Sequence, residues 1–408
     1  MEPILFLVHR IPFPPNKGDK IRSFHLLRHL ADRYRVHLGT FVDMPEDLAH
    51  VPQLEALCAS HHVETLDPRA ARLRSVSGFL TGEALTLPYY RNANLQAWVR
   101  RAVGERGIRK AVVFSAAMAQ YVRDIAGLRV VLDFVDVDSA KWSEYAQRHA
   151  WPSSFVYRRE GAKLLAFERE AAERSAANVF VTRGEADLFL RLAPGLERNV
   201  HVVENGVNTD YFAPHAERPS PFAANEAPIV FTGAMDYWPN IDAVAWFAAE
   251  VLPRVLAVRP DVRFYIVGMN PAPAVSALGS HPGVTVTGTV PDVRPYVQHA
   301  AAVVAPLRVA RGIQNKILEA MAMARPVVVS TAASLGVSGV PGREYEVADS
   351  PEEFAQKVLA VLHPETGAEM GRLGRSRITS DYAWDRNLAT FDRLLEDDVA
   401  PTVTRVVR

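Results

Sequence analysis

Cysteine is almost absent from this chain of 408 residues, because Cys58 stands alone. One cysteine cannot form an intramolecular disulfide, so we expect a fold that does not depend on an oxidising compartment. Long apolar runs are missing as well. The run from Ile4 to Val8 is too short for a signal-peptide core, and no stretch approaches the roughly 20 apolar residues of a membrane-spanning helix. We expect a cytoplasmic protein whose membrane contact, where it has any, is peripheral to the inner membrane.

The chain also lacks an excess of charge. Lys and Arg number 46, as do Asp and Glu. This argues against the strongly basic face of a nucleic-acid-binding protein, so no nucleic-acid partner is expected. Hydrophobic residues make up 49% of the chain, the balance of a folded protein. Because a single core stops growing at about 250–300 residues, the length predicts two domains.

Short apolar runs separated by helical patterns predict two successive α/β domains. Ile4–Val8, the helical pattern of Ile21–Ala31 and the run Val36–Val42 open the first domain with a βαβ unit. We predict boundaries of 1–210 for the first domain, 211–227 for a proline-rich linker, 228–380 for the second domain and 381–398 for a C-terminal helix. Neither domain carries the G-x-G-x-x-G pattern of dinucleotide-binding folds.

Further elements are predicted from the same patterns. Strands are expected at Ala111–Phe114, Val130–Phe134, Val179–Val181, Val200–Val203, Ile229–Gly233, Phe264–Val267, Val284–Thr287, Ala302–Ala305 and Pro326–Val329. Helices are expected at Ile241–Val258, Ile313–Ala324 and Pro351–Leu362. Ligands of such sheets bind at the carboxyl ends of the strands.

The segment Arg308–Arg325 follows one predicted strand and runs into the next. Its helix opens at Gly312, and the amides near Gly312, Ile313 and Gln314 lack intrahelical partners, so they can bind an anion. The helix dipole contributes only about 0.3–1 kcal/mol. The segment therefore predicts an anion site that needs additional positive charge.

Three cations in this segment supply that charge. Arg308, Arg311 and Lys316 can each give a diphosphate charge-assisted hydrogen bonds of roughly 1.5–3 kcal/mol. Glu319, further along the helix, can accept hydrogen bonds from the hydroxyls of a ribose or hexose. The alternative is that Lys316 and Glu319 form an ordinary surface pair at i,i+3. The glycine, the flanking strands and the three cations favour a diphosphate site.

This segment is similar to the donor-binding helix of retaining family 4 glycosyltransferases of the GT-B fold. The resemblance extends to the glycine loop Asn16–Lys20, the junction Glu204–Phe212, the second-domain opening Phe231–Asn240 and the closing segment Tyr382–Asn387. The stretches Asp133–Trp142 and Arg311–Lys316 further resemble a sugar transferase subgroup associated with bacterial exopolysaccharide clusters (PEP-CTERM/EpsH type).

The resemblance implies an α/β fold of two Rossmann-like domains facing each other across a cleft. It also implies a nucleotide-diphosphate sugar donor, a saccharide or polyprenyl-linked acceptor, retention of configuration and no cofactor. The predicted donor-binding residues are Gly18, Gly233, Arg308, Arg311, Gly312, Ile313, Gln314, Asn315, Lys316 and Glu319.

The sequence departs from the family at two places. The family commonly has two glutamates separated by seven residues, and Arg311 stands where the first is usual. The usual Arg and Lys pair after the second-domain glycine, Gly233, is missing too. These departures leave the donor sugar open and make the three cations of the 308–325 segment the expected phosphate ligands.

The first domain is expected to bind the acceptor. Asp136 and Asp138 follow the predicted strand Val130–Phe134, where they can orient or deprotonate an acceptor hydroxyl. The remaining predicted acceptor-binding residues are Asp19, Lys20 and Lys141. The Asp-x-Asp triplet also permits a divalent cation, but three basic side chains already supply charge to the leaving group, so no metal is expected.

Two stretches of the first domain combine basic and apolar residues. They are Arg69, Arg72 and Arg74 before Val76, Phe79 and Leu80, and Arg158, Arg159 and Lys163 before Leu164, Leu165 and Phe167. Either stretch can rest on anionic lipid or form a solvated helix face. Two other functions remain open: a nucleotide-sugar epimerase of the same fold, and a non-catalytic partner subunit.

Overall fold

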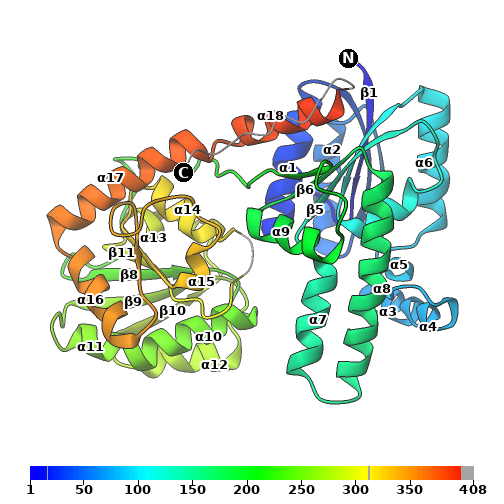
Figure 1. Ribbon diagram of the computed structural model, residues 1–408. Helices are drawn as coiled ribbons and strands as arrows, with labels where there is room; N and C mark the ends of the chain where they lie inside the picture. The colour runs from blue at the N-terminus through cyan, green and yellow to red at the C-terminus, as the bar shows by residue number, and fades with distance from the viewer. Residues whose placement is uncertain (16, 311–312, 397–408) are drawn as a thin grey trace. The chain divides into compact units, whose positions relative to one another are not determined.

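The computed structural model describes residues 1–15, 17–310 and 313–396, and the chain divides into two compact units (Figure 1). Unit 1 comprises Met1–Glu204 together with the C-terminal stretch from Asn387, and unit 2 comprises Asn205–Arg386. Each unit is an α/β domain built on one parallel sheet. No helix among the described residues is long and apolar enough to cross a membrane.

Unit 1 contains a seven-stranded sheet in the order β3-β2-β1-β4-β5-β6-β7. The strands are β1 (Pro3–Val8), β2 (Arg35–Val42), β3 (Ser60–Thr65), β4 (Lys110–Phe114), β5 (Arg129–Val135), β6 (Ala177–Phe180) and β7 (Val200–Val202). The helices are α1 (Gly18–Ala31), α2 (Pro52–Glu55), α3 (Pro68–Ser75), α4 (Ser77–Thr81), α5 (Thr86–Tyr89), α6 (Ala93–Arg106), α7 (Asp138–Arg148), α8 (Ser153–Arg174) and α9 (Arg183–Leu192). Residues 4–8 of β1 are fully buried because helices cover both faces of a parallel sheet.

Unit 2 contains a six-stranded sheet in the order β10-β9-β8-β11-β12-β13. The strands are β8 (Ala227–Thr232), β9 (Val262–Val267), β10 (Val284–Gly288), β11 (Ala302–Ala305), β12 (Val327–Val329) and β13 (Glu346–Val347). The helices are α10 (Trp238–Trp246), α11 (Leu252–Leu256), α12 (Pro273–Ala277), α13 (Arg294–Gln298), α14 (Asn315–Ala322), α15 (Thr331–Ser334), α16 (Pro351–Val361) and α17 (Pro364–Asp381), and α18 (Trp384–Leu395) begins in unit 2 and continues in unit 1. Both sheets are doubly wound, with the chain order reversing at one point in each.

The structure adds elements that the apolar runs did not predict. Strand β3 has the sequence Ser-His-His-Val-Glu-Thr and is only half-buried, because it lies at the edge of its sheet. Strand β13 is likewise an edge strand of two residues. Edge strands tolerate polar residues, so they carry no continuous apolar signal.

The helix predicted at Ile241–Val258 is interrupted. Helix α10 begins earlier, at Trp238, and a π-helical turn at Phe247–Val251 leads into α11. Pro253 in the first turn of α11 has no N–H to donate, and a π turn is a common adjustment at such a point.

The stretch predicted as a linker, 211–227, packs on unit 2. Phe212 and Phe222 contact its apolar core, and the backbone N–H of His215 donates to Gln298 Oε1 at 2.9 Å. The boundary between the two compact units falls between Glu204 and Asn205, so the predicted linker belongs to unit 2. Beyond unit 2, helix α18 enters unit 1 from Asn387, where Asp392 Oδ1 lies 2.9 Å from His29 Nε2.

Candidate functional site

The reversal of chain order in unit 2 lies between the neighbouring strands β8 and β11. Gly233 follows β8 and Arg308 lies just beyond β11. Helices α10 and α14 follow the same two strands. In open α/β sheets, ligands bind outside the carboxyl ends of the strands at such a reversal. The predicted donor residues of unit 2 are therefore grouped where this topology places a ligand.

Lys316, in the first turn of α14, makes the central contact of this site. Its Nζ donates to Asn240 Oδ1 of α10 at 2.7 Å and lies 3.9 Å from the centroid of the Phe231 ring. Asn240 Nδ2 in turn donates to Ala234 O at 2.9 Å, which fixes the amide. The ammonium is thus held by a neutral amide and an aromatic face, and no carboxylate in this set neutralises it.

Gly233 provides the space for this arrangement. A Cβ at this position would lie 2.8 Å from Asn240 Nδ2 and 3.1 Å from Lys316 Nζ. Its φ of +156° is also one that side-chain-bearing residues rarely adopt. A side chain here would displace the amide or the ammonium.

Lys316 and Glu319 are both only partly exposed to water. Burial lowers the pKa of Lys316 to about 7, against the opposing effect of the Glu319 charge. Burial likewise raises the pKa of Glu319 to about 7, against the charge of Lys316. Strong perturbation of two neighbouring groups is typical of functional sites. The pair is not the exposed surface pair that was the alternative interpretation.

The other predicted donor residues have different surroundings. Arg308 is exposed, and its guanidinium forms a bidentate pair with Asp242 of α10, with Nε 2.8 Å from Oδ2. Ile313 packs against the core, and Gln314 is the N-cap of α14. Asn315 Oδ1 is buried and accepts no hydrogen bond from the described residues. Arg311 and Gly312 lie outside the described residues.

In unit 1, Lys141 joins the two predicted catalytic carboxylates. Its Nζ lies 3.0 Å from Asp136 Oδ2 and 3.0 Å from Asp138 Oδ1. Burial by itself lowers the pKa of Lys141, but the charges of Asp138 and Asp136 outweigh this effect, so the pKa of Lys141 is raised above its ordinary value. Asp136 Oδ1 is buried and has no hydrogen-bond partner among the described residues, so one acceptor atom stays available.

Three buried carboxylates fix the loop that carries these residues. The N–H groups of Val135, Val137 and Ser139 donate to Asp133 Oδ1 at 3.2 Å, Glu185 Oε2 at 2.8 Å and Glu168 Oε1 at 3.1 Å, respectively. Asp136 and Asp138 lie between these three residues in the sequence.

The backbone of this loop is strained. Val135 has φ +68°, which costs a β-branched residue about 1–3 kcal/mol. Such strain persists only where the surroundings determine the conformation, as the three carboxylates do here.

Asp19 belongs to a network at the carboxyl ends of β1 and β2. Arg10 Nη1 donates to Asp19 Oδ2 at 2.7 Å, and Arg10 Nη2 donates to Asp43 Oδ2 at 2.7 Å. His9 Nε2 lies 3.4 Å from Asp19 Oδ2. Burial by itself raises the pKa of Asp19, but the interactions with His9 and Arg10 outweigh this effect and bring the pKa below its ordinary value. The carboxylate therefore stays ionised and oriented.

Lys20 and Gly18 lie in the same part of α1. Lys20 is only 1% exposed, and its ammonium is bonded to Asp47 Oδ2 at 2.5 Å and to Phe13 O at 3.1 Å. Its ammonium is thus buried and already bonded to other groups of the protein, so we do not include Lys20 in the acceptor site. Gly18 is exposed as the first residue of α1, where no side chain caps the helix.

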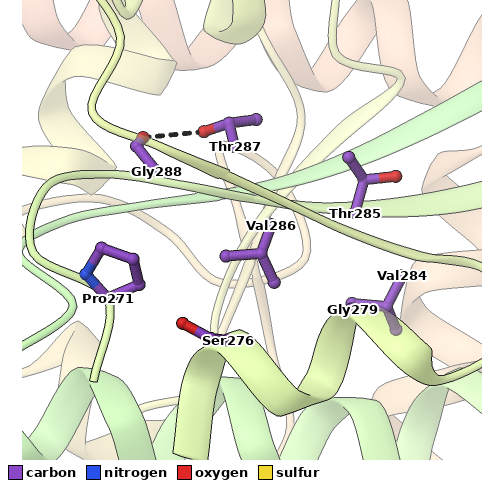
Figure 2. A pocket seen from close by; sticks show the side chains of 8 residues that line it. All are labelled: Pro271, Ser276, Gly279, Val284, Thr285, Val286, Thr287 and Gly288. Atoms are coloured by element: carbon purple, nitrogen blue, oxygen red, sulfur yellow. Dashed lines mark hydrogen bonds between the residues drawn. The ribbon is translucent and has the colours of Figure 1, made fainter. Parts of the chain in front are cut away.

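Unit 2 also has a hollow of about 530 Å³ along its edge strand β10 (Figure 2). Its lining residues are Pro271, Ser276, Gly279, Val284, Thr285, Val286, Thr287 and Gly288. No ionisable side chain lines it, so it does not offer a counter-charge to a diphosphate. Within 1–15, 17–310 and 313–396, no group of three or more His, Cys, Asp or Glu residues could hold a metal ion.

Sequence reasoning missed several participants. Asn240 and Phe231 lie in the quoted opening of the second domain, but nothing in their spacing links them to Lys316. Arg10 and Asp43 were missed for the same reason. The signal that could have found them is their place just after a predicted strand or in the helix that follows.

Comparison with known proteins agrees with this architecture. Residues 226–364 match the family of glycosyl transferases group 1. Sucrose-phosphate synthase from Thermosynechococcus elongatus has a TM-score of 0.71 at 18% identity, over 97% of this chain and 98% of that one. HepE from Anabaena, solved in complex with UDP-glucose, has a TM-score of 0.68 at 16% identity, over 97% and 99% of the two chains.

A further similar structure is WaaG, a glycosyltransferase involved in lipopolysaccharide biosynthesis. It has a TM-score of 0.66 at 15% identity, over 97% of this chain and 100% of that one. No curated protein sequence matches. At these identities the structural likeness shows the fold, two Rossmann-like parallel sheets of the GT-B type. Residues 226–364 thus form a glycosyltransferase group 1 domain within a chain of the GT-B fold.

Proposed function

We propose that the protein transfers a sugar from a nucleotide-diphosphate sugar to a hydroxyl of a saccharide or lipid-linked acceptor. The observation that carries this proposal is the ammonium of Lys316, held by the neutral Asn240 amide at the strand reversal of a glycosyltransferase group 1 domain. A nucleotide-sugar donor is further supported by HepE, a structural neighbour solved with UDP-glucose.

In this proposal, unit 2 binds the donor. Transfer breaks the bond between the anomeric carbon and the diphosphate oxygen, and negative charge grows on the leaving diphosphate. Lys316 stabilises that charge, together with the first amides of α14. Glu319 accepts hydrogen bonds from sugar hydroxyls of the nucleotide or hexose. Arg308 reaches the diphosphate after exchanging its Asp242 partner.

Unit 1 binds the acceptor. The free oxygen of Asp136 accepts a hydrogen bond from the acceptor hydroxyl, and Lys141, which donates to both Asp136 and Asp138, orients that carboxylate. The hydroxyl oxygen attacks the anomeric carbon and its proton leaves to a carboxylate or to the departing phosphate. Asp19, fixed by Arg10, offers a second acceptor for sugar hydroxyls.

Finer features of the proposal rest on the resemblance of the sequence. Retention of configuration follows from the similarity to family 4 enzymes, and we name no nucleophile. A role in bacterial exopolysaccharide or cell-surface glycan synthesis follows from the similarity to the exopolysaccharide-associated subgroup. The single cysteine agrees with a reaction in the cytoplasm.

The test is incubation of the purified protein with UDP-, GDP- and dTDP-sugars, with and without polyprenyl-diphosphate saccharides. Acceptor-dependent release of nucleoside diphosphate, with a new glycosidic bond detected by mass spectrometry and its anomeric configuration by NMR, is the expected result. Epimerisation of a donor without acceptor identifies an epimerase instead. A folded protein that binds none of the donors fits the partner-subunit alternative.

A further inference from the structure

Unit 1 exposes a group of large apolar side chains that its core does not use. Helices α3 and α4 form an almost continuous helical segment that ends at Gly82. On it, Leu73 is 76% exposed and Leu80 is 92% exposed, and Val76 and Phe79 are exposed as well. Leu73, Val76 and Leu80 recur at the spacing that places residues on one face of a helix.

Basic residues surround this apolar face. Arg69 and Arg72 are exposed on α3. No acidic residue occurs between Asp67 and Glu83. The segment thus has a positive charge and an apolar face together, the composition of helices that lie in the plane of a membrane interface.

The segment is fastened to the body of unit 1. Arg74 donates to Pro88 O at 2.8 Å and to Tyr89 O at 2.9 Å. Arg159 of α8 donates to Gly78 O at 2.7 Å and stacks 4.7 Å from the centroid of the Phe79 ring. Its apolar side chains are therefore presented outward on a supported element.

The neighbouring part of α8 extends the surface. Figure 1 shows α7 and α8 paired and running away from the sheet of unit 1, with α3 and α4 beside α8. Phe155, one turn before Arg159, and Trp151, before the start of α8, are exposed. Arg158 and Lys163 are also exposed, and Glu160, the one acidic residue between Tyr145 and Phe167, is buried against Leu85 and Thr86.

The second basic stretch of the sequence, Arg158–Phe167, does not form one continuous surface in the structure. Leu164 and Phe167 are buried in the core, and Arg159 holds the α3–α4 segment. Leu164 and Phe167, which the prediction associated with lipid, are thus not on the surface, whereas Trp151 and Phe155 are exposed. Only the first stretch exposes all the apolar residues named from sequence, which are Val76, Phe79 and Leu80.

We propose that residues 68–82, extended by Trp151 and Phe155, form a docking surface for an anionic lipid bilayer. The apolar side chains enter the interface, and Arg69, Arg72, Arg158 and Lys163 contact lipid phosphates. The positive charge of the surface favours an anionic bilayer over a second copy of the chain, because two copies of the same surface would bring like charges together. Helix α7 begins at Asp138 and has 11 residues, so it connects the carboxylate site to this surface over about 16 Å.

The test is co-flotation of the full chain with phosphatidylcholine vesicles, with and without phosphatidylglycerol. Binding is expected only with the anionic lipid and should weaken as salt is added. Replacing Arg69→Gln and Arg72→Gln should lower the partition coefficient roughly fivefold for each arginine. Leu73→Ser and Leu80→Ser should lower it roughly tenfold each.

Matched variants separate these effects from general loss of charge or apolar surface. Arg100→Gln with Arg101→Gln removes two exposed charges from α6, and Leu335→Ser removes an exposed leucine of unit 2; neither should alter binding. A Leu80→Trp variant should be quenched by brominated lipid, which tests insertion without any loss of binding. Thermal unfolding verifies that each variant is folded.

Three outcomes would overturn the proposal. The first is no binding to anionic vesicles, and the second is binding that the control variants reduce as much as the test variants. The third is self-association in analytical ultracentrifugation that Leu73→Ser with Leu80→Ser abolishes, which would make this surface a contact between copies. None of these measurements depends on sugar transfer, so the result is independent of the proposed function.

Discussion

Lys316 Nζ donates a hydrogen bond of 2.7 Å to Asn240 Oδ1, although the two residues stand 76 positions apart in the chain. A neutral amide orients an ammonium without cancelling its charge. An anionic ligand that enters the site therefore meets an oriented cation whose hydrogen-bond partner is neutral, with the charge of Glu319 acting on it from further along the helix. A carboxylate at position 240 would hold the same ammonium but compete with the ligand for it.

This contrast leads to a prediction for Asn240→Asp. The new carboxylate should pair with Lys316 and lower the affinity for UDP-glucose, or for the donor that binds best, by roughly tenfold or more. Isothermal titration calorimetry measures this directly. Asn94→Asp, an equal change of charge at an exposed position of unit 1, should leave the affinity unchanged. Equal affinities of Asn240→Asp and the unaltered protein would remove Lys316 from the phosphate site.

Gly233→Ala tests the space beside the same ammonium. The added Cβ would lie 2.8 Å from Asn240 Nδ2 and 3.1 Å from Lys316 Nζ, so the pair must shift. We expect weaker donor binding and a loss of stability of about 1–3 kcal/mol, measured by calorimetry and urea unfolding. Gly104→Ala, in helix α6 with nothing within 4 Å, should instead be neutral or stabilising. A Gly233→Ala protein that binds donor normally would show that the site adapts.

The pH dependence of donor binding follows from Lys316 and Glu319, whose pKa values are both near 7. As pH rises above about 7, Lys316 loses its proton and the diphosphate loses its cation. As pH falls below about 7, Glu319 gains a proton and accepts hydrogen bonds less well. UDP-glucose has only phosphodiester groups, which do not titrate in this range, so its affinity should be greatest near neutral pH.

Single variants separate the two limbs of this profile. Lys316→Met should flatten the alkaline limb and Glu319→Gln the acid limb, in calorimetry across the same pH range. At about pH 8, binding to the unaltered protein should also take up a fraction of a proton, seen as a dependence on buffer ionisation heat. A profile that neither variant alters would show that these two groups do not contact the donor.

How far the sequence predicts this site depends on whether the partners lie near each other in the chain. Lys316 and Glu319 could be identified because one helix carries them behind a strand. Asn240 could not, because its contact with Lys316 joins two helices that follow different strands. Lys20 shows the opposite error. Its position beside Gly18 suggested a ligand contact, but its partner, Asp47, lies 27 positions away and holds it inside the protein.

The same distinction applies to the fold. Buried strands such as β1 are continuous apolar runs, and the sequence predicts them to within a residue or two. Strand β3 is a half-buried edge strand, so the residues that pair with β2 are largely polar and leave no pattern. The π-helical turn before Pro253 depends on how one helix accommodates a missing N–H, which periodicity does not encode.

Lys141→Met tests the carboxylate site of unit 1. Without the ammonium, Asp136 loses the group that orients its carboxylate and is left to repel the nearby Asp138. The transfer rate should fall and the KM for acceptor should rise, with donor affinity unchanged. Lys357→Met, which breaks an ion pair with Glu346 in unit 2, serves as the control. A change confined to donor binding would contradict the assignment of the acceptor to unit 1.

The buried carboxylate of Glu168 gives a prediction about stability. Burial raises the pKa of Glu168 to about 8, although hydrogen bonds from Ser139 oppose this. Between about pH 4.5 and about pH 8, the folded protein keeps a proton that the unfolded chain has released. Unfolding therefore releases a proton, and the contribution of Glu168 to the free energy of unfolding falls as pH rises through this window.

Glu168→Gln removes this titration. The variant should become more stable relative to the unaltered protein as pH increases from about 5 to about 9. That is, the difference in the free energy of unfolding, variant minus unaltered protein, should increase, whatever its value at low pH. Urea unfolding at several pH values measures the slope of this difference. Glu173→Gln, at an exposed position of the same helix, should give a difference that pH changes little. Parallel curves for Glu168→Gln and the unaltered protein would mean that Glu168 is ionised when it holds the Ser139 amide, and that the loop carrying Asp138 is fixed by a charged group.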